Sequence, residues 1–164
     1  MKTANKLSLQ FDAIIDAPFG AVGFFKYGGQ VSIELMTEKH APKSAADKTV
    51  QIIASQITAY FNNVNHVFKQ PMNQHGTPFQ QRVWQAISAI PRGQVLTYAQ
   101  IAAQIGSGPR AVANACGANN CPIIVPCHRV VAKNGLGGFM QGSADGLKVK
   151  RWLLEHEGVR VEQY

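Results

Sequence analysis

The sequence has no long hydrophobic run. No stretch of the 164 residues approaches the roughly 18 apolar residues that a membrane-spanning helix requires. Met1 to Asn5 lead into alternating sequence and not into an apolar block, so we expect no signal peptide. We therefore expect a protein without a membrane partner that works in the cytoplasm.

Cysteine is scarce, with Cys116, Cys121 and Cys127 as the three cysteines of the chain. An odd number in a chain without a secretion signal indicates reduced thiols. Because residues 1–75 contain no cysteine, a thiolate zinc site is excluded there. A zinc site of these three cysteines and His128 remains an alternative, but its spacing matches no common zinc module, so we predict no metal. No glycine-rich dinucleotide motif follows a strand, and we predict no cofactor.

Arginine is absent from the first 75 residues. That segment holds seven Lys and five acidic residues, a net charge of +2, whereas residues 76–164 hold three Lys, six Arg and four acidic residues, a net charge of +5. Guanidinium groups bind phosphate and stack on bases, so the second half is predicted to bind nucleic acid. A solvated basic surface is the alternative.

The first half has the pattern of a small sheet with one helix. Apolar residues alternate over residues 7–15 (Leu7, Leu9, Phe11, Ala13, Ile15), form a run over 21–27, and alternate again over 31–35. Gly28-Gly29 predicts a hairpin between the second and third strands. A helix is expected with Ser44 as N-cap and Asp47 one turn on, ending near Asn62-Asn63. Its predicted buried residues are Val50, Ile53, Ile57, Tyr60 and Phe61.

Residues 63–75 are polar and include Pro71, Asn73 and Gln74, which is typical of a linker or a surface loop. The predicted domains are therefore residues 1–75, a scaffold, and residues 76–164, which carry the chemistry.

The second half is predicted to be mainly helical. Thr77, Pro78 and Gln80 form a capping box with proline at the first helical position, and Pro91-Arg92-Gly93 ends that helix. Its predicted core face is Phe79, Val83, Trp84, Ile87 and Ile90. Ile123-Ile124-Val125 is expected to be a short strand-like run, 134–138 a loop, and 147–157 a final helix that buries Leu147, Trp152, Leu153 and Leu154.

Two short helices in this half predict a helix-turn-helix. A second capping box opens a helix over 97–105 that Gly106 closes, and Pro109 begins another that runs to about Ala118. The second helix has unusually small side chains apart from Arg110. They are Ala111, Ala113, Asn114, Ala115 and Gly117. It could lie against a sugar-phosphate wall with Arg110 projecting; tight helix packing is the alternative.

Cys127 is the candidate nucleophile. It follows a proline and precedes His128 and Arg129, and nearby cationic groups lower the pKa of a thiol and so favour the reactive thiolate. A structural buried cysteine is the commoner case.

The surrounding sequence resembles a known family. Pro126-Cys127-His128-Arg129-Val130-Val131 is similar to the signature of O6-alkylguanine-DNA alkyltransferases (methylated-DNA–protein-cysteine methyltransferases). Further matches follow in the family's order at Gly76-Thr77-Pro78-Phe79-Gln80, Val83-Trp84, Ile90-Pro91-Arg92-Gly93, Thr97-Tyr98, Ile101-Ala102, Arg110-Ala111-Val112, Asn119, Pro122-Ile123-Ile124-Val125, Trp152-Leu153-Leu154 and His156-Glu157-Gly158. The matches cover nearly all of residues 76–158, while the first 75 residues resemble the family only in layout.

The resemblance implies an α+β fold, with an N-terminal ribonuclease H-like three-stranded sheet and helix and a C-terminal winged helix-turn-helix domain. It implies irreversible transfer of an alkyl group from O6-alkylguanine, with O4-alkylthymine as a further candidate substrate, to Cys127, once per molecule. His128 would act as base through a water molecule and Glu157 would orient it. Tyr98 would donate to guanine N3, and Asn119 would brace the turn before the acceptor.

The resemblance also implies that a monomer binds double-stranded DNA through the minor groove. Arg110 would fill the gap left by a flipped nucleotide. The DNA-facing residues would be Arg110, Ala111, Ala113, Asn114, Thr97 and Tyr98. The guanine pocket would be lined by Val130, Val131, Phe139, Met140, Pro122 and Trp84, and backbone groups of Cys127, Val130 and Val131 would read the base edge.

The sequence departs from the family at three places. Asn119-Asn120-Cys121-Pro122 stands where relatives commonly have Asn-Pro-Val-Pro; we predict that Cys121 is not the acceptor, because it lacks the adjacent histidine. The Gly-Gly turn at the pocket lip is lengthened to 141–146, and the stretch from Tyr98 to Arg110 is slightly short. Two other functions stay open: a DNA-binding module without chemistry, and a cysteine hydrolase that uses Cys127, His128 and Glu157.

Overall fold

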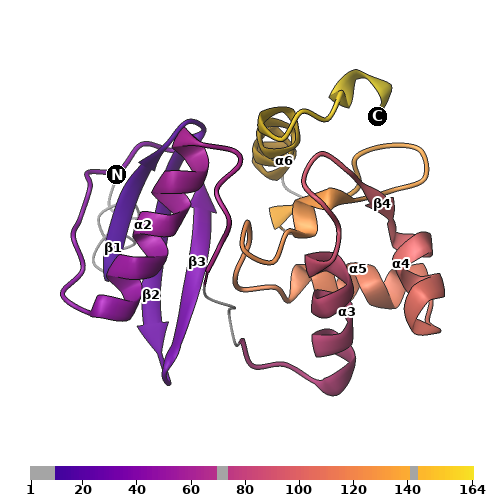
Figure 1. Cartoon of the computed structure of the whole chain (residues 1–164), viewed down its shortest axis with the longest axis horizontal. Helices are drawn as coiled ribbons and strands as arrows, with labels where there is room; N and C mark the ends of the chain where they lie inside the picture. Colours follow the sequence, from indigo (N-terminus) through magenta and orange to yellow (C-terminus); the bar gives the residue numbers. More distant parts are fainter. Residues whose placement is uncertain (1–9, 70–73, 141–143) are drawn as a thin grey trace. The chain divides into compact units, whose positions relative to one another are not determined.

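The computed structural model describes residues 10–69, 74–140 and 144–164 (Figure 1). The chain divides into two compact units, residues 1–74 and 75–164. The expectations for Met1 to Asn5, for Leu7 and Leu9, for Pro71 and Asn73, and for residues 141–143 lie outside the described residues.

The N-terminal unit is built on a three-stranded antiparallel sheet. Strands β1 (Ala13–Ala17), β2 (Gly20–Tyr27) and β3 (Gln30–Met36) lie in chain order. Gly28 and Gly29 both have positive φ, +58° and +78°, so a two-residue hairpin joins β2 to β3 as predicted. The first strand was predicted less well, because Ile14 is more deeply buried than Ile15.

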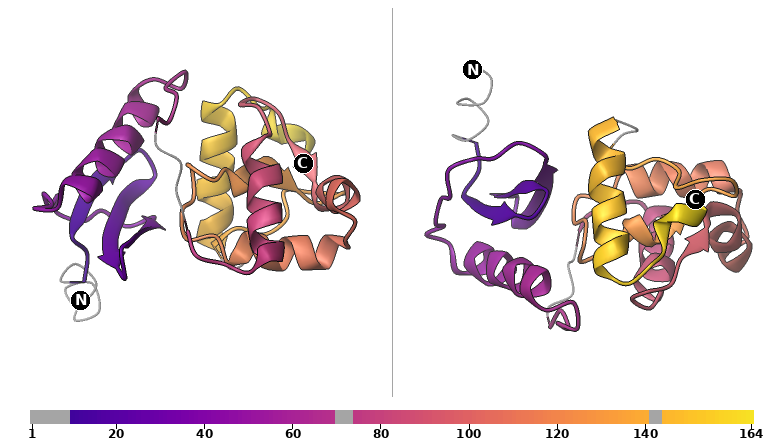
Figure 2. Two further views of the ribbon diagram at one scale, coloured as in Figure 1. Left: turned by 60° about the horizontal axis from the view of Figure 1, so that its bottom comes forward. Right: turned by 90° about the horizontal axis from the view of Figure 1, so that it is seen from above.

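Both faces of this sheet are covered. Helix α2 (Lys48–Asn62) lies across one face (Figure 2), and its buried side chains are Val50, Ile53, Ala54, Ile57 and Tyr60. On the other face, Ile14 packs with Phe11 and Ala21. Each fully buried aliphatic or aromatic side chain contributes roughly 1.5–3 kcal/mol to folding. Apolar burial therefore holds this unit together.

The start of α2 differs from the prediction. Asp47, not Ser44, is the N-cap, and its carboxylate accepts from the Val50 N–H at 3.1 Å. Ser44 is followed by irregular backbone, so the helix begins four residues after it. Phe61 is only partly buried and stacks edge-on against Phe19, with ring centroids 5.6 Å apart.

In the C-terminal unit, helix α3 (Pro78–Ser88) begins with the predicted capping box. Gln80 N–H donates to Thr77 Oγ1 at 3.1 Å, and Thr77 N–H donates to Gln80 Oε1 at 2.9 Å. Its core face includes Trp84, whose Nε1–H donates to the Ala115 carbonyl at 2.9 Å. This bond joins α3 to α5.

The next two helices are where the sequence predicts them. Helix α4 (Tyr98–Ile105) ends at Gly106 with φ +68°, and helix α5 (Pro109–Gly117) follows after a short turn. The two helices pack on each other and on α3. A parallel pairing of β4 (Leu96–Thr97) with β5 (Val130–Val131) was not predicted, and it brings the start of α4 next to the segment after Cys127.

Two expectations for the later part of the chain were wrong in detail. The run 123–125 is a turn and not a strand: Ile123 has φ 75°, and Val125 N–H donates to the Cys121 carbonyl at 2.9 Å. Helix α6 is Ala144–His156, so it begins three residues before Leu147 and ends before Glu157. Leu153 and Leu154 are buried as predicted, whereas Leu147 and Trp152 are only partly buried. A short 3-10 turn, η3 (Val161–Gln163), follows α6.

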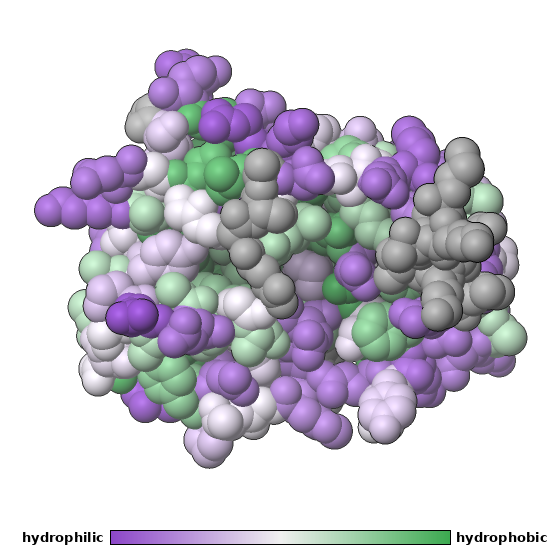
Figure 3. Space-filling view, turned by 180° about the vertical axis from the view of Figure 1, so that it is seen from behind, coloured by the Kyte–Doolittle hydropathy of each residue, from purple (hydrophilic) through white to green (hydrophobic). Residues whose placement is uncertain are grey.

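The structure is thus a mixed α+β fold. Polar and apolar residues are mixed over the face of the molecule seen in Figure 3. Within the described ranges, every helix is too short or too polar to cross a bilayer.

Candidate active site

The candidate nucleophile sits in a single 3-10 turn, η1 (Cys127–Arg129), against which α3 and α6 pack. Arg129 N–H donates to the Pro126 carbonyl at 2.9 Å, and Val130 N–H donates to the Cys127 carbonyl. A 3-10 turn sends consecutive side chains in different directions. Cys127 keeps 8% of its surface exposed, while His128 is completely buried.

Asn119 holds both the sulfur and the turn that precedes it. Its Nδ2 donates to Cys127 Sγ at 3.2 Å and to the Val125 carbonyl at 2.9 Å, and its Oδ1 accepts from the Cys121 N–H at 3.0 Å. One amide side chain therefore fixes the sulfur relative to residues 121–125.

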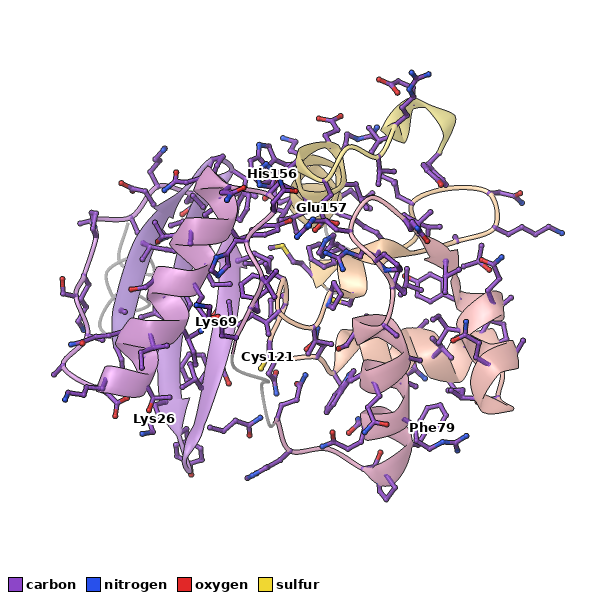
Figure 4. All side chains as sticks on the ribbon, in the orientation of Figure 1. Lys26, Lys69, Phe79, Cys121, His156 and Glu157 are labelled. Carbon is purple, nitrogen blue, oxygen red and sulfur yellow. The ribbon has the colours of Figure 1, made fainter. Side chains whose placement is uncertain are left out.

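Glu157 reaches His128 although it lies 29 positions further along the chain. His128 Nε2 is 3.0 Å from Glu157 Oε2, and both side chains are fully buried. Arg129 binds the same carboxylate through Nε and Nη2, each at 2.9 Å, and donates through Nη1 to the Ile90 carbonyl at 2.7 Å. Figure 4 shows Glu157 at the end of α6, apart from Cys121 on the loop that follows α5.

These contacts determine the state of the imidazole. Burial opposes ionisation of Glu157, but hydrogen bonds from Arg129 and His128 outweigh it and hold the pKa of that carboxyl well below its usual range. Burial lowers the pKa of His128, against the opposing effect of Glu157, so the ring is neutral. A carboxylate only accepts hydrogen bonds, so Nε2 carries the ring proton. Nδ1 is then unprotonated, and within the described residues it has no hydrogen-bond partner. It can accept a proton.

The thiol itself is not made acidic by its sequence neighbours. Burial raises the pKa of Cys127, and the hydrogen bond from Asn119 and the charge of Lys150 partly oppose that increase. The expectation that His128 or Arg129 lowers this pKa was wrong. His128 is neutral, and the guanidinium of Arg129 is committed to Glu157 and to the Ile90 carbonyl.

Lys150 is a charged residue at this site that the sequence reasoning missed. It is 0% exposed, and its Nζ donates to the carbonyls of Val130 at 2.7 Å and Gly138 at 3.1 Å. A signal was present, because Lys150 precedes Glu157 by seven positions on one helical face with the buried Leu153 and Leu154. A lysine on a face that is otherwise apolar could have been identified.

Tyr98, at the start of α4, lies beside this lysine. Its hydroxyl donates to the Gly138 carbonyl at 3.4 Å, and its ring centroid is 5.9 Å from Lys150 Nζ. Burial, followed by the nearby thiols, raises the pKa of Tyr98 to about 12, so its hydroxyl keeps its proton and can donate. A Cβ at Gly137 would lie 2.9 Å from the ring, which explains a glycine with φ +77° there.

The residues expected to face DNA differ in exposure. Arg110, in the first turn of α5, is exposed and makes no hydrogen bond or ion pair with the part of the chain that the structure describes. Ala113 and Asn114 are exposed, and Ala111 is partly buried. Thr97 Oγ1 already accepts the Gln100 N–H at 3.1 Å as a helix cap.

The residues expected to line the pocket fall into two groups. Val130, Val131 and Phe139 are buried, the two valines directly after the Cys127–Arg129 turn, and Pro122 and Met140 are partly exposed. Trp84 does not fit that expectation, because it is buried between α3 and α5 and its N–H is bound to Ala115.

Burial disfavours ionisation of the remaining two thiols as well. Burial raises the pKa of Cys116 and of Cys121 to about 12 in each case. All three cysteines lie in described segments and form no disulfide. Among the described residues, no three His, Cys, Asp or Glu side chains are grouped so that they could hold a metal ion.

Comparison with known proteins agrees with this geometry. Residues 78–159 match the family model of the 6-O-methylguanine DNA methyltransferase DNA-binding domain. A methylated-DNA–protein-cysteine methyltransferase of Salmonella typhimurium is 55% identical over 85 residues, which are 51% of this chain and 48% of that protein. The chain thus matches about half the length of that relative.

Two solved structures resemble the whole chain. The O6-methylguanine methyltransferase of Mycobacterium tuberculosis has a TM-score of 0.71 and 33% identity, covering 92% of each chain. The Mycobacterium tuberculosis OGT in complex with DNA has a TM-score of 0.67 and 35% identity, covering 88% of this chain and 90% of that one. These matches, together with the Pro126–Val131 sequence and the buried His128–Glu157 pair, show that the chain belongs to the methylated-DNA–protein-cysteine methyltransferase family.

Proposed function

We propose that this protein repairs alkylated DNA by moving the alkyl group from O6 of guanine onto Cys127. The observation that carries the proposal is the buried His128–Glu157 pair together with a neighbouring cysteine in the chain, which keeps 8% of its surface exposed and whose sulfur Asn119 holds. An unprotonated Nδ1 on the residue that follows the thiol in the chain could serve as its base, as in activated cysteines, if a water molecule joins the two.

The reaction balances without a cofactor. His128 Nδ1, through a water molecule, takes the thiol proton, and the sulfur attacks the alkyl carbon in line with the C–O6 bond. The S–C bond forms as the C–O6 bond breaks, and its electron pair moves onto the guanine. Tyr98, which keeps its proton, donates to N3 and offsets that charge. The thioether has no route back to a thiol, so each molecule acts once.

The alkylated base has to leave the duplex, because the alkyl carbon bonded to its O6 cannot be reached while the base is stacked. Arg110 would fill the gap; its exposure and the small side chains around it on α5 support this role. We assign α4 and α5 to a winged helix-turn-helix that approaches the minor groove, since a smooth helix with one long side chain suits insertion better than base reading.

The base edge would be read by carbonyl groups. The N–H groups of Cys127 and Val130 already donate, to the Val125 and Cys127 carbonyls. Carbonyl oxygens of this turn, including that of Val131, remain able to accept from the exocyclic amine of guanine. Phe139 and the valines would pack on the ring, and O4-alkylthymine is a second candidate substrate.

The N-terminal unit would be a ribonuclease H-like scaffold. Its described residues have an apolar core with no buried Asp, Glu, His, Lys or Arg side chain, which supports a packing role. We take the active form to be a cytoplasmic monomer, because one copy of residues 75–164 contains every group that the reaction requires.

One assay tests the proposal. The full chain is incubated with a duplex that carries O6-methylguanine labelled in the methyl group, and the label is followed by peptide mapping. We expect one label per molecule, on Cys127, and none with Cys127→Ala, which should still bind the duplex. Cys121→Ala is the matched control and should label fully.

Each other outcome has a clear meaning. Binding without transfer would indicate a recognition module, and repeated turnover on esters would indicate a hydrolase. Label on Cys127→Ala would move the acceptor elsewhere. Any of these results contradicts the proposal.

A further inference from the structure

Of the buried charged side chains around Cys127, some are paired with an opposite charge and one is not. Arg129 and Glu157 neutralise each other through two hydrogen bonds, and His128 between them is neutral. Lys150 is buried as well, but among the described residues no carboxylate lies within ion-pair distance of it. Its ammonium is held by carbonyl dipoles alone. Burying a charge is strongly unfavourable unless the charge is paired and hydrogen-bonded.

The negatively charged group that the Lys150 ammonium could stabilise must be one of the ionisable side chains near it. They are Tyr98 from α4, Cys116 from α5, and Cys127 and His128 from η1. Tyr98 and Cys116 each have a pKa raised to about 12 and stay neutral at neutral pH. His128 bears no negative charge in either state. Burial raises the pKa of Cys127 as well, but the proposed function requires this thiol to become a thiolate, and the charge of Lys150 favours that form.

The hydrogen bonds of Lys150 also join two segments that follow Cys127 in the chain. The Val130 carbonyl belongs to the residue that closes the acceptor turn, and the Gly138 carbonyl belongs to the loop that also receives the Tyr98 hydroxyl. The Lys150 ammonium therefore connects the end of the Cys127–Arg129 turn to the loop whose Gly138 carbonyl also accepts from Tyr98.

We propose that Lys150 is a positioning residue whose ammonium is the counter-charge of the Cys127 thiolate and whose two carbonyl contacts hold the acceptor turn against the 136–139 loop. This inference rests on the proposed function, because it assigns the charge that makes Cys127 reactive. It gives Lys150 the role that the sequence suggested for Arg129.

The test measures the thiol and not the repair. The full chain reacts with iodoacetamide without DNA over pH 6 to 10, and the rate at Cys127 is followed by peptide mapping. Without the ammonium, we expect the pH profile of Lys150→Met to move up by about one unit, a loss of roughly tenfold in rate at neutral pH. Lys148→Met is the matched control, since Lys148 is exposed on the same helix, and it should not move the profile.

Two further variants separate charge from structure. Lys150→Gln keeps a donor for the Val130 carbonyl but has no charge, and it should shift the profile as Lys150→Met does; it also carries the test if Lys150→Met does not fold. Lys150→Arg keeps the charge and should stay within about threefold of the wild type. An unshifted profile in a folded Lys150→Gln or Lys150→Met overturns the inference.

The two proposals fail separately. If the wild type takes up the methyl label but neutral variants keep the wild-type pH profile, Lys150 is structural and the repair function stands. If the profiles shift but no methyl group moves from DNA, the proposed function fails while the effect of Lys150 on the thiol remains.

Discussion

The two units of the chain bury different kinds of side chain. In the described part of the N-terminal unit, the core is apolar and Gln74 is the buried polar residue. In the C-terminal unit, His128, Lys150 and Glu157 are buried, and Cys127 is buried with them. Buried charge is expensive to maintain, and perturbed groups gather at functional sites. The difference teaches that apolar packing accounts for the core of the N-terminal unit, whereas the C-terminal unit buries ionisable side chains at a cost in stability that a reactive site would explain.

The comparison predicts that changing a buried charge has the largest effect. Glu157→Gln should lower the free energy of unfolding by about 3–5 kcal/mol, because Arg129 and His128 lose a shared partner inside the protein. Methyl transfer should slow by about a hundredfold or more, since the imidazole is no longer held in its reactive tautomer. Urea denaturation and single-turnover transfer measure the two effects. Glu155→Gln, at an exposed position in the last turn of α6, should change neither.

The same network sets the response to acid. The folded-state pKa of Glu157 and that of His128 both lie below their ordinary values of 4.5 and 6.5. The unfolded chain therefore binds protons at a higher pH than the folded chain does, and stability should fall as pH drops through 6.5 and then through 4.5. Glu157→Gln should flatten the lower part of this curve. An unchanged curve would argue against the buried carboxylate.

In the N-terminal unit the expected effect is on stability alone. Ile57→Ala removes a completely buried side chain of α2 and should cost about 2–5 kcal/mol. It should leave the pH profile of Cys127 alkylation unchanged, because no ionisable group is involved. Ile52→Ala, at an exposed position of the same helix, is the control. A shifted pH profile of Cys127 alkylation in Ile57→Ala would contradict the conclusion that the N-terminal core affects stability alone.

An exposed charge of the C-terminal unit should matter only when DNA is the substrate. Arg110→Ala should slow transfer from a duplex by roughly tenfold or more, because base flipping costs a few kcal/mol, and should leave the reaction with free O6-methylguanine intact. Arg151→Ala removes the same charge at an exposed position of α6, and it should slow transfer from the duplex less than Arg110→Ala does. Equal losses on both substrates contradict the insertion role.

The smallest effect is expected at a helix end. Thr77→Ala removes the cap of α3 and should cost about 1 kcal/mol without changing transfer once the protein is folded. Ser88→Ala, exposed at the other end of the helix, serves as the control. A strong loss of transfer in Thr77→Ala would mean that surface caps are coupled to the site.

Local signals could be predicted from the sequence. The capping boxes at Thr77 and Thr97, the Gly106 stop and the Gly28-Gly29 hairpin depend on hydrogen bonds and dihedral angles within a few residues. The predicted N-cap at Ser44 failed because two capping residues stood near one another and packing selected Asp47. The strand expected at 123–125 failed because apolar runs of three residues have no periodicity to read.

The sequence by itself determined the elements, the boundary region and the acceptor motif around Cys127. Only the tertiary structure decided that Glu157 meets His128, that Arg129 turns to Glu157, and that Lys150 is the cation beside the thiol. The physical reason is range: helices and turns form from neighbours along the chain, whereas a pKa responds to burial and to charges that folding brings from about 20 to 30 positions away.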